Sequence, residues 1–302
     1  MQVLSNKLGL CAVAAAACLA IAPAQADTGK LSLTGGITSI DGAAGGGITP
    51  WATIGTLGNE IGVSAAVSTL RTNDYDFRAT GLAIAFKDRY ELSIGKQELG
   101  FERDHVVAGQ RLNMDVIGLK ARIAGEAILD SDNLMPQISV GLLHKKMTNS
   151  DGLTSTLNSL GIKPEGNEIY VSATKLLLNK GLLLNGTLRY TNANQNGLLG
   201  FGTSAANGND QARFYPEFSA AYLLKSNLAI GAEYRIKPNN LSLAVAGGNG
   251  VAEDEWKDIF VAYTPVKNLT LTLAYVDLGR VAGAFTNNRQ QTGTFLSAQV
   301  AF

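Results

Sequence analysis

The last eleven residues, Thr292–Phe302, read TGTFLSAQVAF and alternate with a period of two. Three apolar residues stand at every second position before the terminal Phe302, namely Leu296, Ala298 and Val300. The residues between them are small or polar, with Phe295 as the exception. Successive side chains of a β-strand point to opposite faces. The pattern therefore predicts a strand with one face toward an apolar medium and the other toward water.

Residues 1–26 have the organisation of a secretory signal peptide. A single charge, Lys7, precedes an apolar run, and a small-residue cleavage site follows it at Ala24 and Ala26. The run from Leu8 to Ala22 is shorter than the roughly 20 residues that a transmembrane helix needs. We therefore predict export through the secretory pathway and a mature chain of residues 27–302 that forms one domain.

Composition narrows the class of protein. Cys11 and Cys18 are the only cysteines and lie in the predicted signal peptide, so the mature chain is expected to hold no disulfide. It has 24 basic residues (25 less Lys7) against 25 acidic ones, which gives no basic face for a nucleic acid. No later stretch reaches 18 uninterrupted apolar residues, which excludes helical membrane spans.

Alternating segments bounded by turn residues follow one another along the mature chain. We predict thirteen strands, at residues 47–57, 60–70, 75–86, 89–97, 111–124, 134–146, 167–178, 181–193, 211–224, 227–237, 255–264, 268–279 and 291–302. Five short turns between them bring apolar residues opposite apolar residues, as a one-sided sheet requires. The predicted pairs are Trp51 with Val67, Phe86 with Tyr90, Val171 with Leu188, Phe218 with Tyr234 and Tyr263 with Leu269.

Long polar connections alternate with these short turns, at residues 99–110, 147–166, 193–210, 238–254 and 280–290. Outer-membrane barrels show this asymmetry, with short turns on the periplasmic side. Aromatic residues near both ends of the apolar face predict two interfacial girdles. The inner girdle would hold Phe86, Tyr90, Tyr222 and Tyr263, and the outer one Trp51, Tyr190, Phe214 and Tyr234.

The fold class is therefore all-β, a transmembrane antiparallel up-and-down barrel. A sheet inside a bilayer must close, because an unpaired backbone group costs several kcal/mol there. Bacterial single-chain barrels have even strand numbers. Residues Lys30–Ile40 also alternate, which favours them as a fourteenth strand. The alternative is twelve strands, with residues 27–57 folded inside the lumen and Thr292–Phe302 paired with Glu60–Leu70.

Catalytic and nucleotide-binding motifs are weak. The stretch Asp41–Gly47, DGAAGGG, lacks both the Lys of a P-loop and the GxGxxG spacing, so it predicts a flexible turn or a lumen plug. A serine hydrolase needs a base beside its nucleophile, and neither His105 nor His144 has an obvious Ser or Asp partner. We predict no enzyme activity, no metal and no cofactor.

Charges on the inward-facing parity are the candidate functional residues. They are Glu91, Lys120, Arg122, Arg189, Arg213, Glu217, Glu233 and Arg235, with Glu217 opposite Arg235. Eight strands give a filled interior and 16 to 18 an open channel. A barrel of 12 to 14 strands lies between, so a plugged lumen and a narrow passage both stay open.

Two stretches carry a family resemblance: LTGGITSIDGAAGGGITPW at Leu33–Trp51 and MDVIGLKARIAGEAILDSDNLMPQISVGLLHKK at Met114–Lys146. They resemble an uncharacterised proteobacterial family of predicted outer-membrane proteins, a domain of unknown function. The resemblance implies the barrel fold and an outer-membrane location, but it brings no assigned activity.

We expect a narrow or gated passage for a small solute in the bacterial outer membrane. The alternative is a structural or interaction barrel with a filled lumen, whose outer loops bind a surface partner. The expected partners are outer-membrane lipid and the barrel-assembly machinery, which would read Leu296, Ala298, Val300 and Phe302 as its signal.

Overall fold

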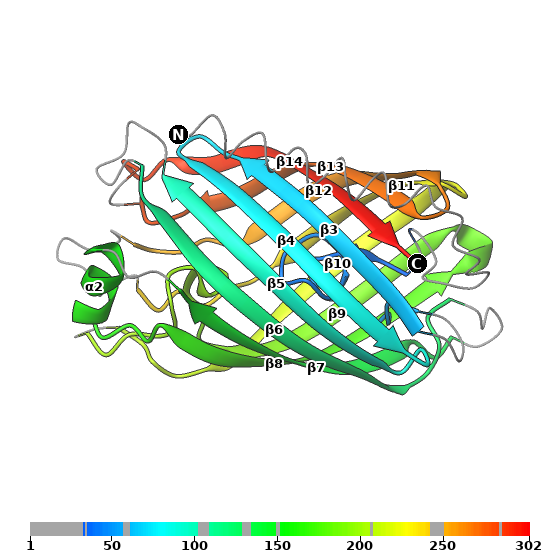
Figure 1. The fold of residues 1–302 in the computed structure, drawn as a ribbon, viewed down its shortest axis with the longest axis horizontal. Coiled ribbons are helices and arrows are strands. Elements are labelled where there is room, and N and C mark those ends of the chain that lie inside the picture. The colour runs from blue at the N-terminus through cyan, green and yellow to red at the C-terminus, as the bar shows by residue number, and fades with distance from the viewer. Residues whose placement is uncertain are drawn as a thin grey trace.

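The computed structural model describes residues 33, 35–56, 61–101, 109–128, 134–148, 152–205, 208–241, 251–283 and 286–302. Twelve antiparallel strands form a closed barrel, the tilted cylinder of Figure 1. Its strands are β3 (Ile61–Arg71), β4 (Tyr75–Phe86), β5 (Tyr90–Phe101), β6 (Arg111–Ala124), β7 (Gln137–Met147), β8 (Glu165–Leu177), β9 (Leu182–Thr191), β10 (Arg213–Lys225), β11 (Leu228–Arg235), β12 (Trp256–Val266), β13 (Leu269–Arg280) and β14 (Gln290–Ala301).

Five short elements accompany the barrel within the described residues. Two strands, β1 (Ile37–Thr38) and β2 (Ala44–Gly45), pair with each other apart from the barrel. Helix α2 (Gly152–Ser159) lies in a long connection, and the 3-10 turns η1 (Leu178–Lys180) and η2 (Asn194–Gly197) flank β9. No helix among the described residues is long and apolar enough to cross a membrane.

The barrel closes by pairing β14 with β3, from Thr294 opposite Arg71 to Ala301 opposite Ser64. The backbones of Phe302 and Val63 exchange two hydrogen bonds at the end of this seam. The preference for fourteen strands is therefore wrong, and the twelve-strand alternative is confirmed. The wall has no place for a further strand at this seam, because β3 and β14 form hydrogen bonds directly with each other.

The outer surface is apolar because alternate side chains of every strand face outward. On β4 the outward residues Leu82, Ile84 and Phe86 are exposed while the inward residues Ala79, Ala83 and Ala85 are buried. The pattern of the closing strand holds as well: Leu296 is exposed and Phe295, the exception to the alternation, is buried in the lumen. An exposed apolar belt of this kind suits a hydrocarbon surrounding.

Most of the predicted hairpin registers are confirmed. Phe86 pairs with Tyr90, Val171 with Leu188, Phe218 with Tyr234, and Glu217 with Arg235. The last hairpin differs by two residues, since Tyr263 pairs with Leu271 and a bulge lies between Tyr263 and Val266. Pro265 stands in that bulge, and proline has no N–H to donate to a ladder.

The two ends of the barrel differ as predicted. Short turns such as Lys87–Asp88, both with positive φ, join strands at the end where the chain terminates. Longer connections, including the one with α2, lie at the opposite end (Figure 1). Seven of the eight predicted girdle residues face outward and are exposed: Phe86, Tyr90, Tyr190, Phe214, Tyr222, Tyr234 and Tyr263.

The eighth girdle residue, Trp51, is a correction. Trp51 is buried, and its indole Nε1 donates to Ser219 Oγ over 2.7 Å inside the lumen. The predicted strand at residues 47–57 and its pair Trp51–Val67 are wrong for the same reason. Residues 47–56 are all buried inside the lumen, so their alternation does not mark a boundary between lipid and water.

Candidate functional site

Residues 35–56, named here the luminal segment, fill the interior of the barrel and are buried throughout. The blue trace inside the cylinder of Figure 1 follows their path. Glycines with positive φ, Gly36 and Gly42, allow the segment to reverse direction within a narrow space. A Cβ on Gly42 would lie 2.7 Å from the carbonyl oxygen of Ile94, so only glycine fits against the wall there.

The wall binds the luminal segment through backbone groups. Three side chains of β8 and β9 donate to the carbonyl oxygen of Pro50: Ser172 (3.2 Å), Asn185 (3.3 Å) and Thr187 (2.8 Å). Two side chains of β7, Gln137 and Ser139, donate to the carbonyl oxygen of Ala52, each over 2.6 Å. Any residue type could supply these carbonyls, so the contacts fix the path of the segment more than its sequence.

Glu91 of β5 and Lys120 of β6 form a buried ion pair of 3.1 Å that also holds the luminal segment. Glu91 accepts hydrogen bonds from the backbone N–H of Ala44 and of Gly55, each over 2.8 Å. Lys120 Nζ donates to the carbonyl oxygens of Ala44 and Thr53, each over 2.8 Å. The pair is thus satisfied on both sides, which the cost of burying two charges requires.

A second segment enters the lumen from the outer end. Residues 193–203, named here the inward loop, connect β9 to β10 and are all buried. Gln195 and Asn196 adopt left-handed backbone angles, with φ of 44° and 62°. The backbone N–H of Gln195 donates to Glu253 over 2.7 Å, and Lys237 Nζ lies 3.2 Å from the same carboxylate. Burial lowers the pKa of Lys237 to about 8, although Glu253 opposes the shift.

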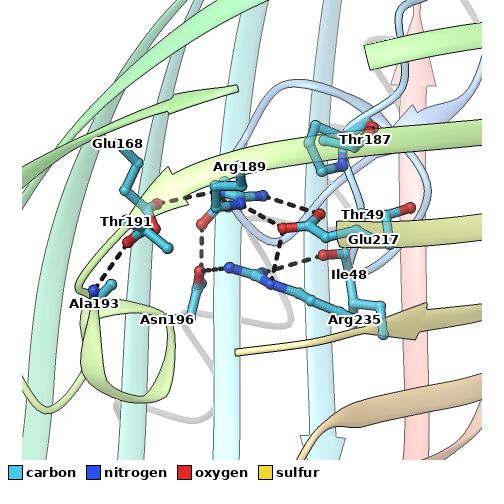
Figure 2. A network of polar contacts seen from close by, with 12 residues as sticks. Ile48, Thr49, Glu168, Thr187, Arg189, Thr191, Ala193, Asn196, Glu217 and Arg235 are labelled. Atoms are coloured by element: carbon cyan, nitrogen blue, oxygen red, sulfur yellow. Dashed lines mark hydrogen bonds and ion pairs between the residues drawn. The ribbon is translucent and has the colours of Figure 1, made fainter. Parts of the chain in front are cut away.

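The inward loop and the luminal segment meet at a network of charges in the outer half of the lumen (Figure 2). Arg189 lies 2.5 Å from Glu217 and 3.1 Å from Glu168. Arg235 donates to Asn196 Oδ1 over 2.7 Å and to the carbonyl oxygen of Ile48 over 3.2 Å. Arg235 of β11 therefore contacts both the inward loop and the luminal segment.

Lys145 completes this network from β7. Its ammonium nitrogen lies 2.7 Å from Glu168, 3.0 Å from Asp41 and 2.6 Å from Asn196 Oδ1. Burial by itself would raise the pKa of Asp41, but Lys145, Arg189 and Arg235 outweigh it and hold that pKa below its usual range. Asp41 is thus an anion at neutral pH and binds the tip of the luminal segment to the wall.

A pair of carboxyl groups lies beside this network. Glu233 of β11 accepts from the backbone N–H of Ile48 over 2.9 Å and from the hydroxyl of Thr49. Asp258 of β12 stands directly opposite Glu233 in the strand register, and both side chains are buried.

Six of the predicted lumen residues lie in these buried contacts: Glu91, Lys120, Arg189, Glu217, Glu233 and Arg235. Arg122 lies lower, at the inner rim, where it contacts Asp88 over 2.8 Å and Glu126 over 2.7 Å. Arg213 shares the inward parity of Glu217 but is exposed, and it is the first residue of β10.

Sequence reasoning missed several members of the network. Lys145, Glu168 and Asp258 stood on predicted strands with inward parity, so strict alternation would have identified them. Asp41 and Asn196 come from irregular segments. No periodicity locates such residues.

The structure describes one of the two histidines that were considered as a catalytic base. His105 lies outside the described residues. His144 faces outward, and its Nδ1 lies 2.9 Å from Asn167 Oδ1. Its outward neighbours along β7 are Leu142 and Lys146, and the residue paired with it on β6 is Ile117. None of these side chains supplies the hydroxyl or thiol that a hydrolase of this kind needs.

A closed antiparallel barrel with an apolar outer belt is the architecture of outer-membrane β-barrels. The chain belongs to the family described as proteins of unknown function, DUF3034, whose match spans residues 34–299. No curated protein matches it significantly in sequence.

Solved structures of outer-membrane barrels are similar to this chain in fold. The NanC porin gives a TM-score of 0.52 at 9% identity, covering 79% of this chain and 98% of that one. The KdgM porin gives 0.47 at 11% identity, covering 79% and 99%. Outer membrane phospholipase A from Escherichia coli gives 0.42 at 11% identity, covering 79% and 89%. At these identities the likeness concerns the fold alone.

Proposed function

We propose that this protein is a gated passage for a small solute across the outer membrane, with the passage closed in the structure described above. The luminal segment closes the barrel along its length, and the inward loop closes it from outside. The NanC porin, whose fold is similar, is consistent with passage through such a barrel.

One observation carries the proposal: the wall holds the luminal segment through hydrogen bonds to backbone groups. Ser139, Ser172 and Thr187 each donate to a carbonyl of this segment. Water can replace each such contact at little net cost, because a hydrogen bond exchanged for one to water changes the free energy by about 1 kcal/mol. Withdrawal of the segment would therefore leave a hydrated polar wall.

A disulfide tests the proposal directly. The methyl carbon of Thr38 lies 2.9 Å from the position of a Cβ on Gly81 of β4, within reach of a disulfide, whose Cβ atoms are ~3.8 Å apart. In the double variant Thr38→Cys, Gly81→Cys, expressed as residues 27–302, these are the only two cysteines. Planar bilayers should show no conductance steps under oxidising conditions and discrete steps after reduction.

The two single variants, Thr38→Cys and Gly81→Cys, are the controls and should conduct regardless of redox state. A double variant that conducts equally when oxidised would show that the luminal segment does not gate the barrel. Complete silence of the reduced variant and of a chain lacking residues 27–56 would reject the passage itself.

The filled interior favours one alternative, a structural barrel whose outer loops bind a surface partner. The ion pairs of Arg189 and Lys145 with Glu168 are buried in the outer half of the lumen. Deletion of residues 195–209 separates the two functions. A passage predicts increased conductance, because Asn196 closes the lumen, whereas an interaction barrel predicts lost partner retention and no conductance.

A further inference from the structure

A small cavity lies between the inward loop and the luminal segment, in the outer half of the lumen. Its volume is about 50 Å³. Apolar side chains of the wall make up most of its lining: Leu70, Phe77, Leu99, Val276, Leu278 and Phe295. The inward loop covers it with Leu198, and the luminal segment contributes Ile40 and Ile48. The wall opposite, on β7 to β10, carries the charges described above.

Two buried polar atoms in the lining have no hydrogen-bond partner within the part of the chain that the structure describes. They are the indole Nε1 of Trp256 and the Oδ1 of Asp258. The two side chains are 4% and 7% exposed and stand two residues apart on β12, so both face the lumen. The indole ring already contacts two cations, because the ammonium group of Lys237 and the guanidinium group of Arg235 lie 4.7 Å and 5.5 Å from its centroid.

Native proteins rarely leave buried polar side-chain atoms unpaired. Trp Nε1 can only donate and needs an acceptor, while a carboxyl oxygen can accept. A hydroxyl group both donates and accepts, so it can pair with both. A purely apolar molecule would leave both unpaired, and an ionic one would be desolvated against the leucine and phenylalanine side chains.

We propose that this cavity binds a small, mainly apolar molecule that carries one hydroxyl group. This inference rests on the proposed function and names the solute class of the passage. An engineered apolar cavity of about 150 Å³ binds benzene, so the closed cavity here is about a third of the size that a ring needs. An alcohol of one or two carbons fits the closed cavity, and a larger alcohol such as 1-butanol requires the inward loop to move.

The position of the cavity fits a binding step before opening. Gln195 and Leu198 of the inward loop and Ile40 and Ile48 of the luminal segment all line the cavity. A solute arriving from outside would pass the inward loop and bind here while the luminal segment still closes the barrel.

Tryptophan fluorescence tests the site. The chain has two tryptophans, so the variant Trp51→Phe leaves Trp256 as the only reporter. Purified barrel in detergent is titrated with 1-butanol and with 1-chlorobutane, which replaces the hydroxyl by chlorine. We expect a saturable change in emission with 1-butanol and at least a tenfold weaker response to 1-chlorobutane. Equal responses to the two compounds would overturn the assignment of the hydroxyl.

Three further variants in the same background localise the response. Val276→Phe fills the cavity and should abolish saturation, while Tyr275→Phe, on the lipid-facing side of the same strand, should leave it unchanged. Leu70→Ala enlarges the cavity and should shift the tightest binding from 1-butanol to 1-hexanol, which keeps the test decisive if the filled variant does not fold. A response that is identical in all three variants would overturn the site.

Conductance measurements keep the two proposals separable. Saturable binding by a barrel that never conducts would support the site and reject the passage. Conductance without saturable binding of any alcohol would reject the site and leave the passage standing.

Discussion

Lys145 shows how strongly single residues are constrained inside this barrel. Its ammonium group is fully buried and contacts two carboxylates, Asp41 and Glu168. Glu168 in turn accepts from Thr191 over 2.7 Å and from Arg189. A charge with so many partners cannot be lost without leaving others unpaired.

Replacing Lys145 by Met should therefore lower the free energy of unfolding by about 3–5 kcal/mol, because it leaves buried carboxylates without their cation. Urea titration of the folded barrel, followed by the heat-modifiable gel shift, measures the change. The adjacent Lys146 is the matched control. Its ion pair with Glu165 is exposed, so Lys146→Met should change the free energy by only about 0–1 kcal/mol. Equal losses would show that the network does not hold the fold.

Asp88, in the turn between β4 and β5, should make stability depend on pH. Burial raises its pKa to about 6, although Arg122 beside it opposes the shift. The folded state then binds the proton more tightly than the unfolded one. Its stabilising contribution is present below about pH 4 and is lost as the pH rises through about 6. Wild type should therefore lose stability relative to Asp88→Asn over this range.

Asp254 provides a control of opposite sign. A hydrogen bond from Arg280 lowers the pKa of Asp254, so its contribution is present above about pH 4 and is lost as the pH falls. The difference between wild type and Asp254→Asn should grow with rising pH. If the stability difference between wild type and variant changed in the same direction with pH for both substitutions, the raised pKa of Asp88 would be contradicted.

At the scale of elements, the inward loop is held by Asn196, whose side chain joins Asp41, Lys145 and Arg235. Asn196→Gly keeps the left-handed backbone, which glycine adopts readily, and removes these contacts together with a 3.5 Å hydrogen bond to Gln97. We expect the open probability to increase at least about tenfold, because hydrogen bonds to charged groups are lost. Single-channel recording measures it.

The exposed Gln211, beyond the inward loop, is the control for this experiment, and Gln211→Ala should leave gating unchanged. Unaltered opening in Asn196→Gly would mean that the inward loop does not close the passage, and the luminal segment would then be the only barrier.

The elements also show what the sequence could reveal. The hairpins at Lys87 and at Lys225–Asn227 can be predicted from the alternation of the sequence alone. In a strand between lipid and lumen, one of every two successive side chains faces lipid and the other faces the lumen. Residues 47–56 alternate in the same way but lie inside the lumen. A sequence shows that a segment has two unlike faces, but it does not show what each face contacts. The bulge at Pro265 and the paths of residues 35–56 and 193–203 depend on contacts distant in sequence, which no local pattern records.

At the scale of the whole molecule, the seam between β14 and β3 gives Phe302 a structural role besides the assembly signal predicted for it. The backbone of Phe302 donates to and accepts from Val63, each over 2.9 Å. Phe302→Ala keeps both hydrogen bonds and removes only the ring, whereas deletion of Phe302 removes both.

If the ring is read by the barrel-assembly machinery, Phe302→Ala should reduce the amount of folded barrel in cells several-fold but refold normally into lipid vesicles. The heat-modifiable band measures both. The deletion should be impaired in both settings, because the seam itself is weakened. Normal assembly of Phe302→Ala in cells would show that this residue acts through its backbone alone.

The luminal segment precedes β3 in the chain, and β3 pairs with β14 to close the barrel. The sheet is therefore an open curved surface until this seam forms. Glu91, Lys120 and Gln137 of that surface can bind residues 44–55 before the circle is complete. The interior can thus be filled during biogenesis, and the wall would curve around contents that are already present. The diameter of the finished cylinder would then be set in part by what it encloses.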